Sequence, residues 1–274
     1  MKYDEIGYWS EVKLDIVQKY ASAYSTIMRA SPVIRQHIYI DAFAGPGKHI
    51  ARRTGKFVLG SPSNALNVNP PFSAYHFIDL DGGRVEELRR VAHGRSDVKV
   101  HEGDCNRVLL DDVFPLCRYQ DFCRALCLLD PYKINVDWNV LQIAGSMGSV
   151  EVFYNFMIMD ANMNVFWKNP DKVAPSQAAR MDHAWGDRSW REIAYTKKAG
   201  LFEEIEEKVE NRTIVQAFQR RLHEVAGFKY VPDPMPMRNS KGAVIYYLFF
   251  ASPNKTGGEI VADIFDSYRN RGMG

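Results

Sequence analysis

The fold of this chain is decided by one stretch, Tyr39-Ile40-Asp41-Ala42-Phe43-Ala44-Gly45-Pro46-Gly47. An apolar run over residues 38–40 ends in an acid, and Gly-Pro-Gly follows shortly after it. This pattern predicts a buried strand that leads into a tight glycine turn. Because glycine has no Cβ, the backbone of such a turn can approach a ligand closely. The stretch therefore predicts a ligand-binding turn at the carboxyl end of a strand.

Three further segments repeat the pattern of a strand that ends in an acid. They are Phe77-Ile78-Asp79-Leu80-Asp81, Val98-Lys99-Val100-His101-Glu102-Gly103-Asp104 and Ala125-Leu126-Cys127-Leu128-Leu129-Asp130-Pro131-Tyr132. The carboxyl ends of parallel strands share one edge of a doubly wound sheet, and such sheets bind ligands at that edge. We therefore expect Asp41, Asp79, Asp104 and Asp130 to lie along a single edge.

Strands alternate with helices over most of the chain, which favours an α/β fold with a parallel sheet. The strands are expected at about 37–43, 74–79, 97–101, 125–129 and 149–158, with a late pair at 228–231 and 243–251. The late pair suggests an antiparallel strand beside the sixth. We expect one domain over residues 1–274, with an N-terminal helical extension at 1–36 and a helical insertion at 160–212 after strand five.

The composition is that of an ordinary globular protein, since 46% of the 274 residues are hydrophobic and 25% are charged. No apolar run approaches the ~18 residues of a membrane helix, and residues 1–5 lack the apolar core of a signal peptide. Four cysteines in a chain of this length do not suggest a disulfide scaffold. The expectation is a cytoplasmic enzyme with no membrane partner. The net charge of +2 does not by itself imply a polyanionic partner, so local charge clusters must carry that argument.

The order and spacing of these motifs resemble the class I S-adenosylmethionine-dependent methyltransferases and, more narrowly, the three-Cys-motif partner (TcmP) family. The matching residues are Tyr8-Trp9-Ser10-Glu11-Val12-Lys13-Leu14, Asp41 to Gly47, Gly60-Ser61-Pro62, Phe77 to Asp81, Gly103-Asp104-Cys105-Asn106, Leu129 to Tyr132 and Val136-Asp137-Trp138. The resemblance implies a Rossmann-like sheet of seven mostly parallel strands with the last antiparallel. It also implies S-adenosyl-L-methionine as cofactor and a separate three-cysteine protein as partner, and it leaves the substrate open.

The resemblance assigns the cofactor to the predicted edge. The residues expected to hold it are Asp41, Phe43, Ala44, Gly45, Pro46, Gly47, Asp79, Leu80, Asp104, Cys105 and Asp130. In this family Asp41 and the glycine turn face the amino-acid part, Asp79 the ribose and Asp104 the adenine amine. Asp81 could bind the ribose in place of Asp79, although helix capping is the role expected for it, and capping is also the alternative role for Asp104. The turn lacks both G-x-G-x-x-G and a Walker Gly-Lys-Ser/Thr ending, which counts against NAD and nucleoside triphosphates.

A catalytic turn is expected at Asp130-Pro131-Tyr132. It resembles the Asp-Pro-Pro-Tyr turns of amino-group methyltransferases, in which the acid and a backbone carbonyl accept hydrogen bonds from the target amine and the aromatic ring stacks on the base. Such positioning supplies much of the rate enhancement. This chain has one proline rather than two, and Lys133 follows. The alternative is that Asp130 lines the cofactor and Tyr132 is a packed residue of the rim.

Substrate contacts are expected from basic residues in loops at the same edge. Lys48, Arg52 and Arg53 lie in the loop at 44–60, and Arg238 and Lys241 lie in the loop after strand six. Arginine and lysine there could bind phosphates, although a solvated loop is the ordinary alternative. Asp160, after strand five, is a further candidate contact.

No metal is expected, because Cys117, Cys123 and Cys127 have C-x5-C-x3-C spacing and no fourth ligand.

Together, the motifs and the family resemblance predict an S-adenosylmethionine-dependent methyltransferase. The expected reaction is N-methylation of a nucleic-acid base, and the resemblance implies a three-cysteine partner. The alternatives are a catalytically silent cofactor- or nucleic-acid-binding subunit of that partner, and a methyltransferase for small molecules or proteins.

Overall fold

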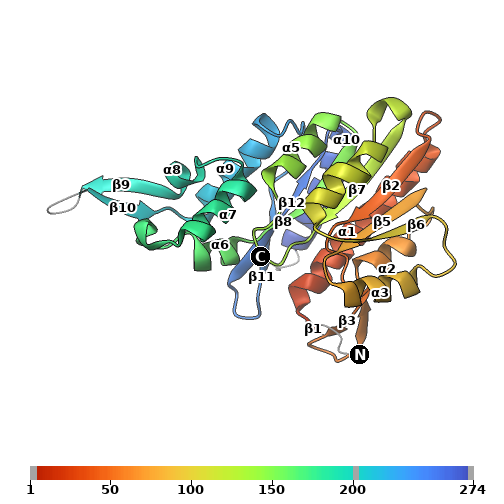
Figure 1. Ribbon diagram of the computed structural model, residues 1–274, viewed down its shortest axis with the longest axis horizontal. Coiled ribbons are helices and arrows are strands. Elements are labelled where there is room, and N and C mark those ends of the chain that lie inside the picture. The colour runs from red at the N-terminus through yellow and green to blue at the C-terminus, as the bar shows by residue number, and fades with distance from the viewer. Residues whose placement is uncertain (1–4, 200–203, 271–274) are drawn as a thin grey trace.

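The computed structural model describes residues 5–199 and 204–270, and a seven-stranded sheet with helices on both faces forms its centre (Figure 1). The strand order is β11-β12-β8-β7-β2-β5-β6. The strands are β2 (Gln36–Asp41), β5 (Ala74–Asp79), β6 (Val98–Glu102), β7 (Cys123–Leu129), β8 (Val150–Phe156), β11 (Met235–Arg238) and β12 (Val244–Ala251). Strand β12 runs antiparallel to both β8 and β11, and the remaining pairs are parallel. The predicted Rossmann-like sheet with an antiparallel last strand is confirmed.

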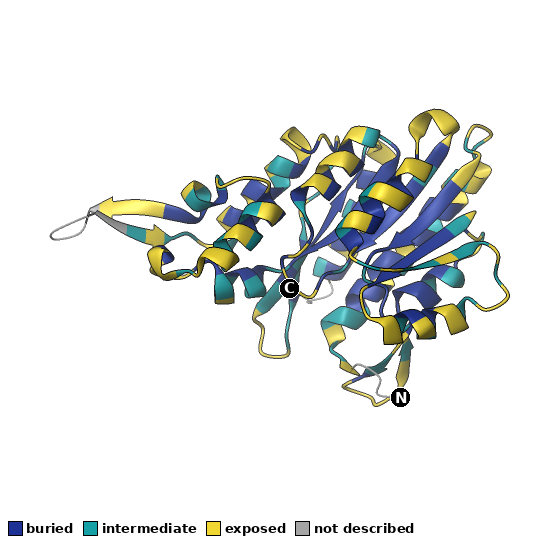
Figure 2. Ribbon diagram, in the orientation of Figure 1, coloured by how far each residue is buried: buried dark blue, intermediate teal, exposed yellow. Residues whose placement is uncertain are grey.

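Two hydrophobic cores cover the two faces of the sheet, because successive side chains of a strand point to opposite faces. On β2, Ile38 and Ile40 enter one core and Tyr39 the other. The Tyr39 face is covered by α1 (Tyr8–Ala30), α2 (Ser61–Leu66), α3 (Gly82–Val91) and α10 (Lys255–Arg269). The Ile38 face is covered by α4 (Cys105–Val108), α5 (Trp138–Met147), α6 (Ile158–Asn164), α7 (Pro175–Trp185), α8 (Trp190–Ala194), α9 (Asn211–Glu224) and the short turns Leu109–Val113 and Phe114–Leu116. Figure 2 shows the buried strands between the exposed outer surfaces of the helices.

The prediction of a strand at 228–231 is wrong. In that segment Tyr230 makes an isolated bridge with Ser252, and the edge strand β11 lies instead inside the segment taken for a loop. Pro236 hides this strand from a sequence pattern, but an edge strand tolerates proline because one side of its backbone has no strand to pair with. Met235 and Met237 alternate with it and are both fully buried, which fixes the register of β11 on β12.

Two small β structures were not expected either. Strands β1 (Glu5–Ile6), β3 (Lys48–Ala51) and β4 (Phe57–Leu59) form a three-stranded sheet from the N-terminal segment and the basic loop. Within 160–212, where helices and loops were expected, β9 (Tyr195–Ala199) and β10 (Glu204–Lys208) form an antiparallel ribbon that projects away from the central sheet (Figure 1). Its pairs include Lys197 opposite Glu206. Opposite charges across a ribbon stabilise it without the apolar alternation that reveals a strand in sequence.

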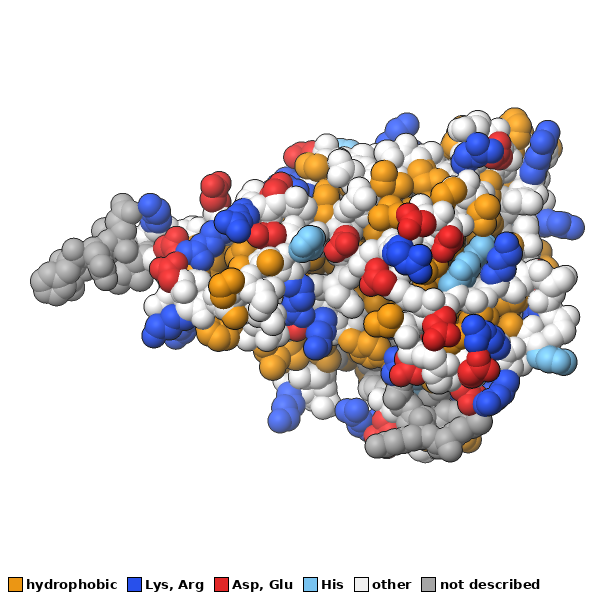
Figure 3. Space-filling model, in the orientation of Figure 1, with side chains coloured by type: hydrophobic (Ala, Val, Ile, Leu, Met, Phe, Trp, Pro, Cys, Tyr) orange, Lys and Arg blue, Asp and Glu red, His pale blue; other side chains and the backbone are white. Residues whose placement is uncertain are grey.

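No helix among the described residues has the length and apolar character needed to cross a membrane. Acidic and basic side chains are interspersed over the face seen in Figure 3, in keeping with the net charge of +2. A local cluster of one sign is therefore informative about function.

The contact between α5 and the chain after α9 predicts a strong effect for a small substitution. A Cβ at Gly145 would overlap the carbonyl oxygen of Ala226. We expect Gly145→Ala to lower the free energy of unfolding by about 1–3 kcal/mol, because the packed backbone must move apart. Urea denaturation measures this. The exposed neighbour Ser146 is the control, since Ser146→Ala should leave the unfolding midpoint within error or raise it slightly. Equal midpoints for Gly145→Ala and wild type would contradict the packing described.

Candidate active site at the carboxyl edge of the sheet

The strand registers bring the four predicted acids to one edge of the sheet. Asp41 ends β2 opposite Leu128 of β7, and Asp79 ends β5 opposite Glu102 of β6. The Gly103 amide donates to the Asp79 carbonyl at 3.1 Å, which places Asp104 directly beyond that edge. Asp130 follows the last residue of β7, whose neighbour Tyr154 precedes Asn155 on β8. The acids therefore lie side by side along the carboxyl ends of four neighbouring strands.

The glycine turn after β2 is held against β5 by backbone contacts. The Gly45 amide donates to Asp79 Oδ2 at 2.9 Å, and the Ala44 amide donates to the Ile78 carbonyl at 3.0 Å. Gly45 and Gly47, on either side of Pro46, have φ of +63° and +76°. These values lie in the left-handed region that glycine enters without steric cost. The two glycines therefore allow the turn to close, and hydrogen bonds to β5 hold it in place.

Asp41 is the acid most deeply enclosed by this turn. Its side chain is fully buried, and Oδ1 accepts a hydrogen bond of 3.4 Å from the Phe43 amide. Oδ2 has no hydrogen-bond partner among the described residues. Burial raises the pKa of Asp41 to about 7, while the Ser61 hydroxyl opposes that rise. An orphaned carboxylate oxygen at a glycine turn fits a donor or a cation from outside the chain.

Asp79 is also buried, and both of its oxygens accept backbone hydrogen bonds. Oδ2 accepts from Gly45, and Oδ1 accepts from the Asp81 amide at 2.9 Å. Each carboxylate oxygen has a second lone pair, so Asp79 retains capacity for two further donors. Leu80 beside it is largely exposed and offers an apolar wall. Asp81 caps α3 by accepting from the Arg84 amide at 3.0 Å, which is the capping role considered for it.

Asp104 is exposed and caps α4, since its Oδ1 accepts from the amides of Asn106 and Arg107 at 3.0 and 3.2 Å. The capping alternative is therefore realised, and it uses one of the two carboxylate oxygens. Cys105 is buried next to it, and burial raises the pKa of its thiol to about 12. This thiol stays protonated at neutral pH, which argues against a nucleophilic role.

Asp130 is bound on both oxygens by side chains that were not expected at the site. The Lys13 ammonium of α1 contacts Oδ2, and the Asn155 amide of β8 contacts Oδ1. The Lys13 side chain is 8% exposed and that of Asp130 is 25% exposed. Lys13 Nζ also lies 5.8 Å from the ring centre of Tyr246. A buried lysine thus fixes the orientation of the predicted catalytic acid.

The sequence contains a signal for Lys13 that lies outside the strand motifs. Lys13 lies four residues after Trp9 and four before Val17, on the apolar face of α1. Residues spaced by four occupy one face of a helix. A lysine on a buried face needs a partner, because an unpaired buried charge is costly. Asn155 gave no such signal, since it lies within a buried strand whose pairing only the fold reveals.

A cavity of about 760 Å³ opens beside this pair. Tyr246 lines it, together with the start of α1, part of β3 and the exposed Tyr132. The Arg84 guanidinium lies 5.6 Å from the ring centre of Tyr132, a distance typical of a cation–π contact. Pro131 is buried and holds Tyr132 at the turn. The cavity has the size of a ligand site.

Arginines from separate segments line this cavity. Arg52 and Arg53 come from the turn after β3, and Arg238 comes from the end of β11. Arg84 of α3 adds a fourth guanidinium, and Glu5 is the acid among the described lining residues. Because β11 runs parallel to β8, its last residue reaches the same edge as Asp130. The cavity wall is therefore strongly cationic.

Three of the predicted substrate residues do not line the cavity. Lys48, at the start of β3, and Lys241, in the turn after β11, lie outside its lining. Asp160 is engaged internally: its Oδ2 accepts from the Ile134 amide at 3.0 Å and pairs with Arg180 at 3.1 Å. These bonds join α6 to the segment after β7. The Asp160 side chain therefore stabilises the insertion.

The buried Asp41 predicts a pH-dependent stability difference. Its folded pKa is raised, so its contribution to stability is present below the unfolded pKa near 3.8 and is lost as the pH rises through about 7. We expect Asp41→Asn to be more stable than wild type at pH 8 and to keep less than half of that advantage at pH 5. The raised pKa corresponds to at most about 4 kcal/mol. Urea unfolding at both pH values measures it, with the exposed Asp111→Asn as control. A difference independent of pH would contradict the burial of this carboxylate.

A scan against known protein families and a search of curated proteins found no match. Solved structures do resemble the chain. Protein LPL1258 from Legionella pneumophila superposes with a TM-score of 0.58 at 11% identity, over 95% of this chain and 91% of that one. A SAM-dependent methyltransferase from Leishmania major has a TM-score of 0.40 at 10% identity, over 87% of this chain and 72% of that one. At 11% identity the likeness to LPL1258 concerns the fold alone, and it accords with the sheet described above.

Proposed function

We propose that this chain is an S-adenosylmethionine-dependent methyltransferase that methylates a nitrogen of a nucleic-acid base. The observation that carries the proposal is the orphaned Oδ2 of Asp41, enclosed by a glycine turn at the edge where the buried Lys13 holds Asp130. A buried carboxylate oxygen next to an oriented acid, at the carboxyl edge of a doubly wound sheet, supports cofactor binding and target positioning at that edge.

The residues at the edge fit the proposed cofactor. The ammonium of its amino-acid part would donate to Asp41 Oδ2, which lacks a donor within the described residues. The two ribose hydroxyls would donate to the remaining lone pairs of Asp79. Leu80 would contact the adenine ring, and the free oxygen of Asp104 would accept from the adenine amine. S-adenosylmethionine supplies a methyl group that a nitrogen lone pair can attack.

The turn at Asp130 would orient the target. Lys13 and Asn155 fix the Asp130 carboxylate, and its neighbour Pro131 is buried, so the position of the turn is rigid. The backbone carbonyls of this turn would accept hydrogen bonds from the target amine, and the exposed Tyr132 ring would stack on the base. Aligning the nitrogen in this way removes an entropic cost from the transfer. A base in a duplex would have to be flipped out of the stack to reach it.

The arginines of the cavity support a polyanionic substrate. Arg52, Arg53, Arg84 and Arg238 face one acid, Glu5, among the described lining residues. Guanidinium groups bind phosphate oxygens with two parallel hydrogen bonds. Because these arginines come from three separate segments, their convergence beside Tyr132 is a property of the folded chain and favours a phosphate backbone over an uncharged small molecule.

A second function is favoured by the same contact that supports the first. Both carboxylate oxygens of Asp130 are already bound by Lys13 and Asn155, which leaves the acid less capacity for a target amine. The chain would then be a catalytically silent subunit that binds the cofactor or nucleic acid. For both candidate functions, the resemblance to the three-Cys-motif partner family implies a separate three-cysteine protein as the partner. That pairing rests on the resemblance alone.

Cofactor binding can be measured directly. We expect S-adenosylmethionine to bind saturably in isothermal titration calorimetry, and Asp79→Asn to weaken it by about tenfold, the effect of one lost charged hydrogen bond. Asp263→Asn on the exposed side of α10 is the matched control and should bind as wild type. Absence of binding at millimolar cofactor would end both the enzymatic proposal and the cofactor-binding alternative.

Methyl transfer separates the two functions. We expect transfer of labelled methyl from the cofactor to RNA or DNA oligonucleotides, with the three-cysteine partner tested in parallel. Lys13→Met should lower kcat by about 10- to 100-fold with little change in cofactor affinity, since it removes a contact that fixes the turn whose carbonyls would orient the target. Lys19→Met, an exposed lysine on the same helix, is the control. Normal cofactor binding with no transfer to nucleic acid or partner would favour the silent subunit.

A further inference from the structure

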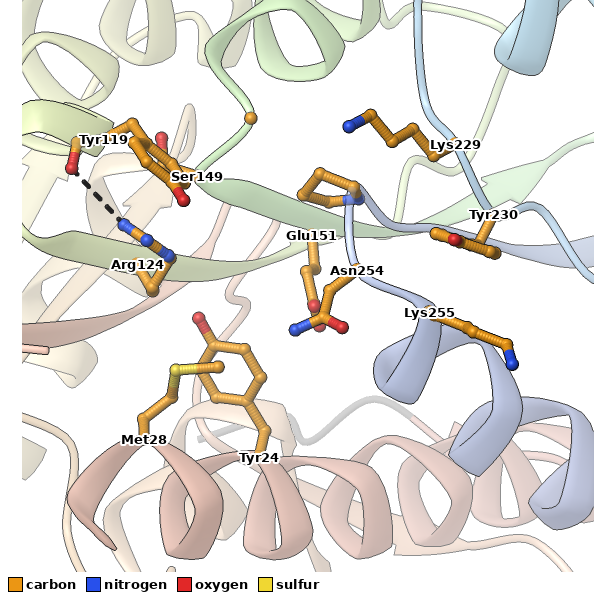
Figure 4. A pocket seen from close by; sticks show the side chains of 12 residues that line it. Tyr24, Met28, Tyr119, Arg124, Ser149, Glu151, Lys229, Tyr230, Asn254 and Lys255 are labelled. Carbon is orange, nitrogen blue, oxygen red and sulfur yellow. Dashed lines mark hydrogen bonds between the residues drawn. The ribbon is translucent and has the colours of Figure 1, made fainter. Parts of the chain in front are cut away.

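A second cavity lies at the opposite, amino edge of the central sheet. Its volume is about 270 Å³. Arg124 and Glu151 line it from the starts of β7 and β8, whereas Asp130 and Asn155 lie beyond or near the ends of the same strands. Tyr24 of α1 and the turn that precedes α10 complete the wall (Figure 4). This cavity is therefore separate from the site at the carboxyl edge.

The Tyr24 hydroxyl is a buried donor without an acceptor. The residue is 3% exposed, and its hydroxyl has no hydrogen-bond partner among the described residues. Figure 4 shows it pointing from α1 into the space below Arg124 and beside Glu151. Burial and the nearby Glu151 raise the pKa of Tyr24 well above its usual value, so the phenol keeps its proton. An unpaired buried hydroxyl is costly, and an acceptor atom in the cavity would satisfy it.

One guanidinium lies beside that hydroxyl, and two lysines line the far side of the cavity (Figure 4). The Arg124 guanidinium lies 3.8 Å from the ring centre of Tyr119 and donates to the Cys123 carbonyl at 2.7 Å, which fixes its position. Lys229 lines the cavity and has no ion pair among the described side chains. Lys255 opens α10, a helix of 15 residues whose N-terminus carries partial positive charge, but its ammonium pairs with Glu259 at 3.2 Å and extends away from Tyr24 (Figure 4). Arg124, Lys229 and the helix end therefore give the cavity wall its positive charge.

Glu151 is the acid among the described lining residues, and its charge is engaged by internal donors. Its carboxylate accepts from the Tyr20 hydroxyl and from Ser252 Oγ, the latter at 2.9 Å. It lies against Gly257 in the first turn of α10, where a Cβ would come within 2.8 Å of Oε1. Burial raises the pKa of Glu151 to about 7, so near neutral pH much of its charge is neutralised. The cavity is therefore cationic on balance.

We propose that this cavity is a binding site for a small oxyanion, namely a phosphate group that is free or carried as a monoester. Its donors are the Tyr24 hydroxyl and the Arg124 guanidinium, and Lys229 on the opposite wall adds positive charge. Phosphate oxygens accept hydrogen bonds from both donors, and a helix N-terminus favours the same charge. The volume is at the lower limit of ligand sites, which suits a phosphate with a short ester group and excludes a whole nucleotide chain.

Isothermal titration of the full chain with inorganic phosphate and with glycerol phosphate tests the proposal. We expect saturable binding of at least one ligand, weakened about three- to tenfold by Tyr24→Phe and by Lys229→Met. Tighter binding of glycerol phosphate identifies a monoester as the ligand, and tighter binding of inorganic phosphate identifies the free ion. Neither substitution touches the carboxyl edge, so cofactor titration serves as a check of folding.

Tyr154→Phe is the matched control. Tyr154 is another buried tyrosine whose hydroxyl has no partner among the described residues, and it lies in the core on the other face of the sheet. This variant should bind phosphate as wild type does. The proposal is overturned if wild type shows no saturable binding of either ligand, or if Tyr24→Phe and Lys229→Met both bind as tightly as the control. Because Lys229 is exposed, its variant keeps the test decisive even if Tyr24→Phe fails to fold.

Discussion

A carboxylate buried without an ion pair among the described residues, at the end of β2, is the constraint on which the carboxyl edge depends. Asp41 is fully buried, and one of its oxygens has no partner among the described residues. Such a group opposes folding when it is ionised. Glycines with positive φ close the backbone around it, and the turn is bonded to the neighbouring Asp79. This arrangement lowers the stability of the folded protein at the edge where a ligand would bind.

Helix α1 connects this edge with the opposite one. Lys13 binds Asp130 beyond the end of β7, and two turns further along the helix Tyr20 binds Glu151 near the start of β8. The half-buried Asp130 and the buried Glu151 are thus each held by a side chain from the same face of one helix. Movement of α1 relative to the sheet would disturb both acids together. Helix α1 therefore contributes to the site as well as to the core.

The sequence predicted the sheet and its acidic edge because both follow from local patterns. Strands that end in aspartate and a Gly-Pro-Gly turn are readable without tertiary information, and Asp41, Asp79 and Asp130 lie where these patterns placed them. The roles given to these residues remain predictions. The edge strand β11 was missed because Pro236 masks its alternation, and the ribbon of β9 and β10 was missed because charge pairs take the place of apolar residues. Lys13 and Asn155 were missed because a partner 117 or 25 residues away is set by packing rather than by spacing.

The central claim is that the orphaned oxygen of Asp41 receives the ammonium group of S-adenosylmethionine. Carbon-13 NMR of labelled aspartate can follow the titration of Asp41 with and without saturating S-adenosylhomocysteine, which carries the same amino-acid part. The account predicts a pKa near the raised value of about 7 in the free protein and a fall of more than about one pH unit on binding, since an opposite charge favours the ionised carboxylate. An Asp41 titration that the ligand leaves unchanged would contradict it.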